Sequence, residues 1–351
     1  MTNEIESFGL DTDLFLSNCV TCIGGREENQ DSCAIKQTNR GLLALVCDGM
    51  GGMSGGAQAS SMAVKEIINY IDNLSADDEV QDDNQTVLKR AISHANSVIY
   101  NESLTLNRGG GMGTTVTALL IDENKATVAY VGDSRVYQIR NGKKKFRTFD
   151  HSMVFELVKK NVLSEEQARL SNQSNIILKA VGIKPEISAD TFDLSYDKGD
   201  SFFLCSDGIW GRLPEKELIK NLSRKKHPKI TTEALAMNIH QGGKVEGGRH
   251  DNLTAAMIIT KTNSKNRTKM EELVKKLFMI TTALFLVSVI CNFIPRKSHE
   301  NKSISDIKVA VYQKNDMIPI DTTGTMTLNK ALEKYKNNSD SAEYVIQFHV
   351  K

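Results

Sequence analysis

The sequence predicts an α+β domain in which helices cover the outside of antiparallel β-sheets, followed by one apolar segment and a short tail. Three observations favour this fold class. Short β-like runs dominate the chain up to residue 260, helical blocks are inserted among them in pairs, and the dipeptide 141-NG-142 is typical of a tight hairpin. A strict alternation of strands and helices would instead indicate a parallel dinucleotide-binding fold, which this order disfavours.

The predicted strands are runs rich in Val, Ile, Thr and aromatic residues, bounded by Gly, Asp or Asn. They cover residues 31–37, 42–47, 114–121, 125–132, 135–140, 201–206 and 253–260. Helices are predicted where apolar residues recur at helical spacing, as Val87, Ala91 and Ala95 do. These helices cover residues 57–71, 86–103, 153–161, 214–222 and 231–241.

Residues 277–294 form an uncharged apolar stretch, with Lys275 and Lys276 before it and Arg296 and Lys297 after it. Its 18 residues reach the lower range needed to cross a bilayer. A buried core helix is the alternative, but such a helix is seldom apolar on every face and flanked by cations at both ends. We therefore expect a single transmembrane helix. The larger number of Lys and Arg residues before it places the N-terminal side in the cytoplasm.

The expected organisation has four parts. They are a main domain over residues 1–262, a basic juxtamembrane linker over 263–276, the transmembrane helix over 277–294 and a small extracytoplasmic α/β tail over 295–351. The tail combines strand-like pieces at 306–313 and 343–350 with a helical 328–336, and no chemistry is assigned to it. The polar, acidic N-terminus lacks the features of a secretory signal. We therefore expect a single-pass protein of the plasma (inner) membrane whose main domain lies in the cytoplasm.

Composition disfavours some classes of partner. Lys and Arg number 44 and Asp and Glu number 43, which gives a net charge of +1 and no basic footprint for nucleic acid. Cys33, Cys47 and Cys205 lie in apolar runs, as is typical of free thiols in a reducing compartment. The pair 19-CVTC-22 has the spacing of zinc ligands. In a strand, however, its two side chains point to opposite faces, and no second pair follows.

The stretch 42-LLALVCDGMGG-52 ends a buried strand on Asp48 and continues with glycines. Glycine lets the backbone adopt a positive φ and lets a ligand approach closely, at an entropic cost. A ligand site is one interpretation of this pattern. The other is a glycine-rich turn in which Asp48 caps the helix predicted over 57–71.

Three further aspartates stand at the ends of predicted strands. Asp207 follows a strand in 203-FLCSDG-208, Asp251 precedes one in 251-DNLTAAMII-259, and Asp133 lies in a turn between two strands. Carboxylates brought together at sheet edges repel one another unless a cation lies among them. Hard oxygen ligands of this kind suit Mg²⁺ or Mn²⁺ and not zinc.

Upstream, the segment 25-GREENQDS-32 adds Arg26, whose planar guanidinium suits bidentate contact with a phosphate. Asn29, Gln30 and Asp31 follow just ahead of a strand. Taken alone, this segment is more typical of a solvated charged loop than of a phosphate site.

The order of the motifs along the chain is the most specific feature of the sequence. R-x-x-N-Q-D, D-G-M-G-G, G-M-G-T-T, V-G-D-S-R, D-H-S, S-D-G and D-N follow one another between about residues 15 and 260. This ordered set resembles the metal-dependent Ser/Thr protein phosphatases, the type 2C or PPM family. Met50 within D-G-M-G-G is similar to the bacterial members of that family.

The resemblance implies a sandwich of two antiparallel β-sheets with a helix pair on each outer face, a four-layer αββα architecture. It also implies two Mn²⁺ or Mg²⁺ ions at one end of the sheets, with a weaker third in many members. Asp48 is expected to bridge the two ions, the Gly49 carbonyl to bind one, and Asp207 and Asp251 to bind the other. Asp133 is expected to help hold the third ion, and Arg26 to bind the phosphate.

The reaction implied by the resemblance is the hydrolysis of phosphoserine and phosphothreonine in proteins. A water shared by the two ions loses a proton and attacks phosphorus in line, while the metals and Arg26 neutralise the phosphoryl oxygens. The expected partners are proteins phosphorylated by a Ser/Thr kinase, together with the membrane through the one helix.

The chain departs from the family pattern at several positions. Gln30 stands where many relatives have Glu, so one metal position loses a negative charge unless Asp31 compensates as a ligand, directly or through water. Met50 and Met53 stand where a histidine is found in relatives, which leaves protonation of the leaving group unassigned, and His151 is expected to be structural. No second Asp follows within 207-DGIWGR-212, which weakens the expectation of a third ion.

Two other classes of function stay open at this point. A catalytically weak or inactive pseudophosphatase would keep the fold and bind phosphoproteins as a signalling module, and Gln30, Met50 and Met53 motivate it. A metal nuclease or cyclase would use the same acidic geometry, but the sequence lacks a basic groove and a nucleotide-binding loop.

Overall fold

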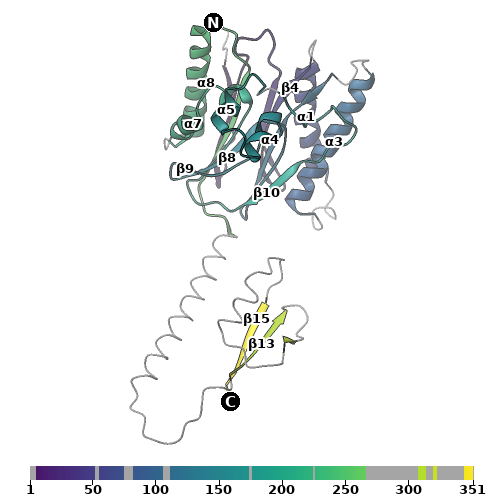
Figure 1. Cartoon of the computed structure of the whole chain (residues 1–351), viewed down its shortest axis with the longest axis vertical. Helices are drawn as coiled ribbons and strands as arrows, with labels where there is room; N and C mark the ends of the chain where they lie inside the picture. The colour runs from purple at the N-terminus through teal and green to yellow at the C-terminus, as the bar shows by residue number, and fades with distance from the viewer. Residues whose placement is uncertain are drawn as a thin grey trace, which may run out of the picture. The chain divides into compact units, whose positions relative to one another are not determined.

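The computed structural model describes residues 5–51, 55–74, 82–105, 111–173, 176–223 and 226–265, together with the backbone of three strands between 307 and 350. Figure 1 labels the elements along the chain. The chain divides into two compact units, Met1–Leu277 and Phe278–Lys351. Both sheets of the main domain and all helices described lie in the first unit.

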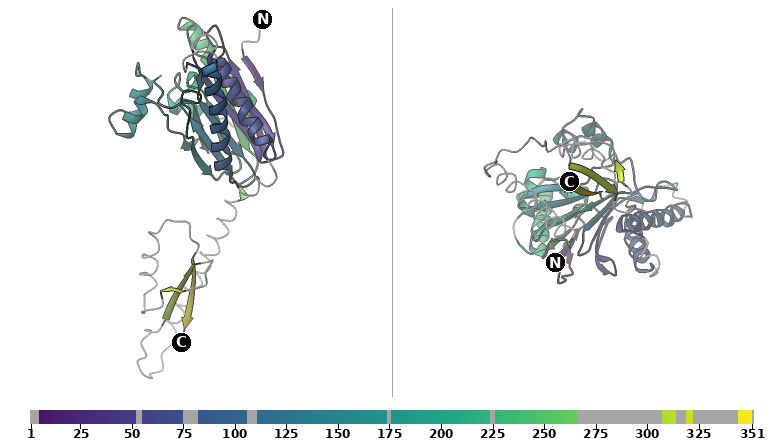
Figure 2. Two further views of the ribbon diagram at one scale, coloured as in Figure 1. Left: turned by 90° about the vertical axis from the view of Figure 1, so that its right-hand side faces the viewer. Right: turned by 90° about the horizontal axis from the view of Figure 1, so that it is seen from below.

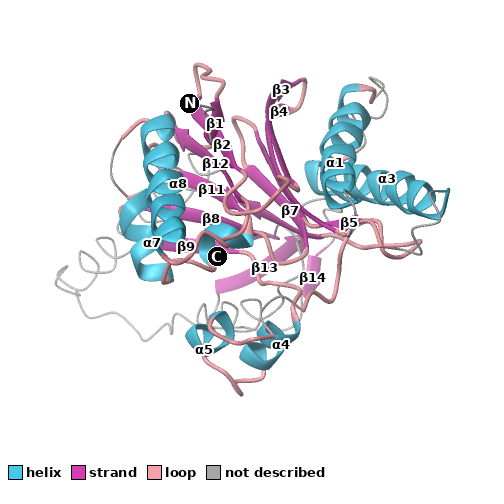
Figure 3. Ribbon diagram, turned by 90° about the horizontal axis from the view of Figure 1, so that it is seen from above, coloured by secondary structure: helices cyan, strands magenta, loops and turns pink. Residues whose placement is uncertain are grey.

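Two antiparallel sheets form the centre of the first unit (Figure 3). The first sheet has the order β1 (Ile5–Phe8), β2 (Phe15–Cys22), β12 (Leu253–Thr260), β11 (Ser201–Cys205), β8 (Arg135–Arg140) and β9 (Lys143–Arg147). The second has the order β10 (Asp190–Leu194), β7 (Ala126–Val131), β6 (Val116–Ile121), β4 (Gly41–Met50) and β3 (Asp31–Thr38). The short β5 (Gly113–Thr114) pairs with the end of β4.

Helices cover the outer face of each sheet. Helices α1 (Gly55–Asp72) and α3 (Asn84–Thr105) pack on the second sheet and lie side by side, as the left view of Figure 2 shows. Helices α7 (Glu215–Leu222) and α8 (Pro228–Val245) pack on the first sheet. Along the chain, the short helices α4 (Met153–Lys159) and α5 (Glu165–Arg169) come between β9 and β10, and α6 (Asp207–Trp210) follows β11.

Strand β4 shows why these strands are apolar on both faces. Leu42, Ala44 and Val46 belong to the core between the two sheets, whereas Leu43 and Leu45 belong to the core under α1 and α3. A strand that is covered on both sides reads as a continuous apolar run and not as an alternating one. The same two-sided burial places Cys19 between the sheets and Cys22 toward the helices, as expected for 19-CVTC-22, and neither residue forms a disulfide.

The predicted α+β sandwich with a helix pair on each outer face is confirmed. Each predicted strand and helix of the main domain has a counterpart, and Asn141 and Gly142 have the positive φ values of 49° and 73° that a tight hairpin between β8 and β9 requires. The elements that were not predicted are β1, β2, β9, β10, α5 and α6. Strands β9 (KKKFR) and β10 (DTFDL) are edge strands, and charged residues at an exposed edge hide the apolar alternation.

The second unit contains β13 (Ile307–Gln313) between β14 (Pro319–Asp321) and β15 (Tyr344–Val350), all antiparallel. The two strands predicted in the tail therefore have counterparts. The predicted helix over 328–336 and the predicted membrane span over 277–294 lie outside the described residues. Among the residues that are described, no helix is both long and apolar enough to cross a membrane.

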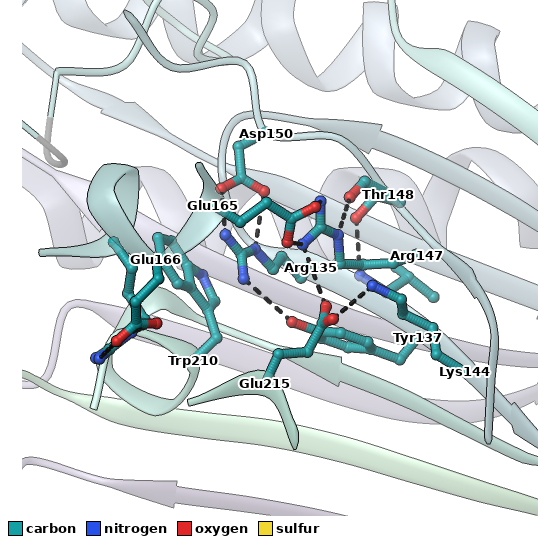
Figure 4. A network of polar contacts seen from close by, with 12 residues as sticks. Arg135, Tyr137, Lys144, Arg147, Thr148, Asp150, Glu165, Glu166, Trp210 and Glu215 are labelled. Carbon is teal, nitrogen blue, oxygen red and sulfur yellow. Dashed lines mark hydrogen bonds and ion pairs between the residues drawn. The ribbon is translucent and has the colours of Figure 1, made fainter. Parts of the chain in front are cut away.

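A buried polar network holds the segment between β9 and β10 against the first sheet (Figure 4). Arg135 on β8 donates from Nε and Nη2 to the two carboxylate oxygens of Asp150, at 2.9 and 2.7 Å, and its guanidinium lies 3.6 Å from the ring centroid of Trp210. Arg147 on β9 pairs with Glu165 on α5 and Glu215 on α7. The side chains of Arg135 and Asp150 are 4% and 0% exposed, so water cannot replace either partner if the other is removed.

Asp150→Ala is expected to lower the free energy of unfolding by about 3 kcal/mol, because it leaves the buried Arg135 guanidinium without its carboxylate. Asp72→Ala is a matched control that removes the half-exposed partner of Lys36, and its cost should stay below about 1 kcal/mol. Urea unfolding of residues 1–265 measures both. Equal, small losses of unfolding free energy in the two variants would show that the buried Arg135 does not depend on Asp150.

Candidate metal centre

A cleft of about 1150 Å³ lies where β4 and β11 end and β12 begins. Its lining combines the carboxylates of Glu27, Glu28, Asp48, Asp133, Asp207 and Asp251 with the guanidinium groups of Arg26 and Arg249. Residues far apart in the sequence therefore meet at one end of the sandwich.

Asp48 is fixed by the backbone around it. In β4 it lies opposite Asp31 of β3, its N–H donates to Thr115 Oγ1 at 3.0 Å, and its carbonyl accepts from the Thr115 N–H at 2.8 Å. The G-M-G-T-T motif thus serves to hold the end of β4. Asp48 lies within a strand, seven residues before α1 begins, and the alternative of a helix cap does not describe its place.

Gly49 has to be glycine because two backbone oxygens crowd it. A Cβ atom there would lie 2.1 Å from the Gly56 carbonyl oxygen and 2.5 Å from that of Gln30. The glycine lets the start of α1 and the β2–β3 loop close around the end of β4. It also leaves Gly49 in the cleft lining without a side chain.

The motif S-D-G divides its roles among three residues. Ser206 Oγ donates to Asp31 Oδ2 at 2.7 Å, and Asp207, the first residue of α6, lines the cleft. A Cβ atom on Gly208 would lie 2.0 Å from the Asn252 carbonyl oxygen, so α6 packs directly under the loop before β12. Asp31 is 8% exposed and lies behind the cleft wall, not in its lining.

Asn252 ties the loop that carries Arg26 to the loop that carries Asp251. Its Oδ1 accepts from the Gln30 N–H at 2.9 Å, and its Nδ2 donates to the carbonyls of Ile23 and Glu28 at 2.7 and 3.0 Å. Arg26 Nη2 in turn donates to Asp251 Oδ2 at 2.7 Å, with both side chains partly exposed. Arg26 and Asp251 are therefore held at the mouth of the cleft as a pair.

Asp133 is clamped through its backbone, while its side chain faces the cleft. Trp210 Nε1 donates to the Asp133 carbonyl at 3.0 Å, and the preceding Gly132 N–H donates to His151 Nδ1 at 3.1 Å. Asp133 is 1% exposed, and its Oδ1 has no hydrogen-bond partner among the described residues. A buried, unpartnered carboxylate oxygen in a cleft wall is a ligand position that protein groups leave open. His151 is structural, as expected, and stacks on Tyr130.

Burial and mutual repulsion raise the pKa values of these carboxyl groups. Burial raises the pKa of Asp48 well above its ordinary value, and the charges of Asp31 and Asp207 add to the effect. Burial, with the charges of Asp207 and Asp251, raises the pKa of Asp31 to about 7 although Ser206 donates to it. Burial and the Asp251 charge likewise raise the pKa of Asp207 to about 6. The pKa of Asp133 is also raised well above its ordinary value, mainly by burial.

The donor set fits a hard divalent cation. Its atoms are carboxylate and carbonyl oxygens, the ligands that Mg²⁺ and Mn²⁺ prefer. A cation among them would offset the repulsion and partner the open Asp133 Oδ1. In the part of the chain that is described, no three Asp, Glu, His or Cys side chains are gathered closely enough to hold one ion by themselves. Asp251, which pairs with Arg26, would have to share its carboxylate with the ion.

The structure brings together Arg26, Asp48, Gly49, Asp133, Asp207 and Asp251 in the cleft lining, as the sequence predicted, and leaves Asp31 just behind them. Met50 also lines the cleft, whereas Met53 lies outside the described residues. The roles of Thr115, Asn252, Trp210 and Glu28 were not predicted from the sequence. The role of Asn252 had the clearest local signal, because an Asn next to a predicted ligand is a common source of hydrogen bonds to the backbone.

The chain is similar to a known protein family and to several characterised proteins. A family model described as Protein phosphatase 2C matches residues 21–241. The Serine/threonine phosphatase stp of Listeria monocytogenes is 32% identical over 249 residues, which are 69% of this chain and 94% of the relative. Protein phosphatase PhpP of Streptococcus pneumoniae is 30% identical over 245 residues, 68% of this chain and 95% of the relative.

Solved structures of similar fold include the serine/threonine phosphatase PstP/Ppp of Mycobacterium tuberculosis. It has a TM-score of 0.60 at 26% identity and covers 70% of this chain and 98% of its own. The catalytic domain of the serine threonine protein phosphatase PstP, solved in complex with two manganese ions, has a TM-score of 0.59 at 25% identity and covers 70% of this chain and 98% of its own.

The raised pKa values predict that the chain without metal loses stability as the pH rises. Folded Asp31 keeps its proton to about pH 7, whereas an unfolded Asp loses it near about pH 4. Folding therefore takes up protons between about pH 4 and pH 7, and stability falls as the pH rises through that window. In chelator, the melting temperature of the wild type relative to that of Asp31→Asn should fall by about 8 °C between about pH 4 and about pH 7.

Saturating Mn²⁺ should cancel this fall, because the ion competes with protons for the same carboxylates. Its stabilising effect on the wild type should be larger near about pH 7 than near about pH 5, and Asp48→Asn should lose most of it. Thermal unfolding in Mn²⁺ and in chelator measures both effects. A Mn²⁺ effect that is equal at the two pH values, or that Asp48→Asn retains, would contradict a metal centre at Asp48.

Proposed function

The chain belongs to the protein phosphatase 2C family as a metal-dependent protein serine/threonine phosphatase, and from that premise we propose that it hydrolyses phosphoserine and phosphothreonine at the cleft around Asp48. We also propose that a C-terminal helix tethers it to the membrane. The single observation that carries the catalytic proposal is the convergence of Asp48, Asp133 and Asp207 in one open cleft, where Asp133 is buried, Asp48 and Asp207 are half-buried, and all three have raised pKa values.

The places of these residues in the cleft support the ligand set that the family resemblance implies. Asp48, which lies opposite Asp31 and lines the cleft together with Asp207, would serve both of two divalent ions, Mn²⁺ or Mg²⁺. The carbonyl of Gly49 would serve one ion, with Asp31 acting from behind the wall, and Asp207 and Asp251 would serve the other. Asp133 would hold a weaker third ion through its open Oδ1. When bound, the ions supply an activated water and neutralise charge that develops on the phosphoryl oxygens.

Arg26 orients the phosphate in this proposal. One of its terminal nitrogens, Nη2, donates to Asp251, which fixes the guanidinium at the mouth of the cleft. The remaining N–H groups can donate to phosphate oxygens in the planar geometry that guanidinium groups favour. The Arg26–Asp251 pair therefore links substrate binding to one of the ligands.

A pseudophosphatase that binds phosphoproteins without turnover is the second candidate. It is favoured by Gln30 and Met50, which occupy the cleft wall with neutral side chains. No imidazole lines the cleft within the described residues, so no histidine is in place there to protonate a leaving group. The intact set of aspartates makes hydrolysis the better supported of the two.

Residues 1–265 are expected to hydrolyse a phosphothreonine peptide and p-nitrophenyl phosphate in Mn²⁺ and to stop in chelator. Asp207→Asn should lower kcat by at least about 100-fold, because a ligand of the reaction centre is lost. Asp72→Asn, on the surface of α1, is the matched control and should leave kcat unchanged. A folded wild type that binds Mn²⁺ and phosphopeptide but turns over neither substrate would establish the pseudophosphatase instead.

The membrane tether is proposed from residues 277–294, the apolar stretch flanked by cations. The substrates would then be proteins that a Ser/Thr kinase has phosphorylated and that lie near the inner face of the plasma membrane. Tethering would raise their local concentration without adding any contact in the cleft.

Cell fractionation should find the full chain in the membrane and a variant lacking 277–294 in the soluble fraction. A periplasmic alkaline phosphatase reporter joined after Lys351 should be active, because the predicted orientation exports the tail. The same reporter on the variant without 277–294 should be inactive. An inactive reporter on a membrane-bound full chain would overturn the orientation, and a soluble full chain would overturn the tether.

A further inference from the structure

The carboxylates of the cleft are unevenly distributed around Asp48. Asp207 and Asp251 come from the start of α6 and the loop before β12, on the side where Arg26 pairs with Asp251. On the side of Gly49 and Gly51, the lining is backbone and the neutral side chains of Gln30 and Met50. The carboxylates in the lining from the neighbouring β2–β3 loop are those of Glu27 and Glu28.

Glu28 is held against this side of the cleft through both its backbone and its side chain. Its carbonyl accepts from Asn252 Nδ2 at 3.0 Å, and its Oε2 accepts from Gln30 Nε2 at 3.3 Å. The side chain is half-buried. Glu28 is therefore part of the cleft wall, and its side chain is held there by Gln30.

Gln30 is fixed in turn around Gly49. Its carbonyl accepts from the Gly49 N–H at 3.0 Å, and its Nε2 approaches the Gly51 carbonyl at 3.4 Å. A Cβ atom on Gly56 would lie 2.6 Å from Gln30 Oε1, so the amide packs closely on the start of α1. The amide that orients Glu28 thus lies directly beside the backbone expected to serve one of the two ions.

The charge balance at this position favours a second anion. Gln30 is neutral, and Asp31 lies behind the wall with its Oδ2 engaged by Ser206. An ion beside Gly49 would then have Asp48 as its one carboxylate from the lining, whereas an ion on the other side would also have Asp207 and Asp251. The unpartnered, buried Asp133 Oδ1 independently indicates that this cleft is built to receive a cation.

We propose that Glu28 supplies the second carboxylate for the divalent cation beside Gly49, directly or through a water, and that Gln30 is the positioning residue that orients it. The charge that Gln30 lacks is thus supplied two residues earlier in the chain. This inference rests on the proposed function of the cleft and goes beyond it in assigning a residue outside the predicted ligand set.

Glu27 provides a matched control within the same loop. It has the same side chain and also reaches the lining, but it is exposed and has no hydrogen-bond or ion-pair partner among the described residues. A general effect of negative charge at the cleft mouth would be shared by Glu27 and Glu28. A ligand role belongs to the oriented residue alone.

The experiment is calorimetric titration of the full chain in mild detergent with Mn²⁺. The wild type should bind two ions, and Glu28→Gln should weaken one of the two sites by at least about tenfold and leave the other unchanged. Glu27→Gln should match the wild type. In the double variant Glu28→Gln/Gln30→Glu, the carboxylate returns beside Gly49, and the lost affinity should be restored.

Each outcome has a separate meaning. A wild type that binds no Mn²⁺ would contradict the proposed function itself. Two sites in the wild type with no change in Glu28→Gln, or an equal loss in Glu27→Gln, would overturn the role of Glu28 alone. If Glu28→Gln proves less stable in thermal unfolding, the double variant decides, because a purely structural defect would not be repaired by a glutamate at position 30.

Discussion

Mutual repulsion among buried and half-buried carboxylates is the constraint on which the rest of this structure depends. Asp48, Asp133 and Asp207 each lie at the end of a strand or in the turn beside one, and burial together with neighbouring negative charges raises the pKa of each. Arg26 and Arg249 are the basic residues of the cleft lining, and Arg26 is engaged by Asp251. Such an arrangement costs folding free energy, which a divalent cation entering the cleft would offset.

Hydrogen bonds from uncharged residues hold the acidic residues in place despite this repulsion. Thr115 bonds the peptide of Asp48, Ser206 bonds Asp31, and Asn252 joins the two loops that carry Arg26 and Asp251. The S-D-G and D-N motifs therefore each contribute an aspartate that lines the cleft and a neighbouring residue that holds another motif in place. Glycines at 49 and 208 let these segments approach to distances that a Cβ atom would forbid.

Trp210 connects the cleft to the buried ion pair of Arg135 and Asp150. Its indole nitrogen donates to the Asp133 carbonyl, and its ring lies under the Arg135 guanidinium that Asp150 neutralises. The segment that follows Asp150 and carries α4 and α5 is thus joined to Asp133 by a short chain of contacts. Asp133 is consequently positioned from two directions, by α6 and by the first residues after β9.

The sequence by itself determined the elements whose signal is local. Two-sided burial makes strands such as β4 read as apolar runs, helical spacing marks α3, and Asn141-Gly142 specifies the β8–β9 hairpin. The ordered aspartates likewise indicated which residues meet. Only the tertiary structure decided that Asp31 lies behind the wall, that Asn252 joins two loops and that the Glu28 side chain accepts from Gln30 in the cleft wall. These facts depend on contacts between residues that are distant in the chain or on the path of an irregular loop, and no local periodicity encodes either.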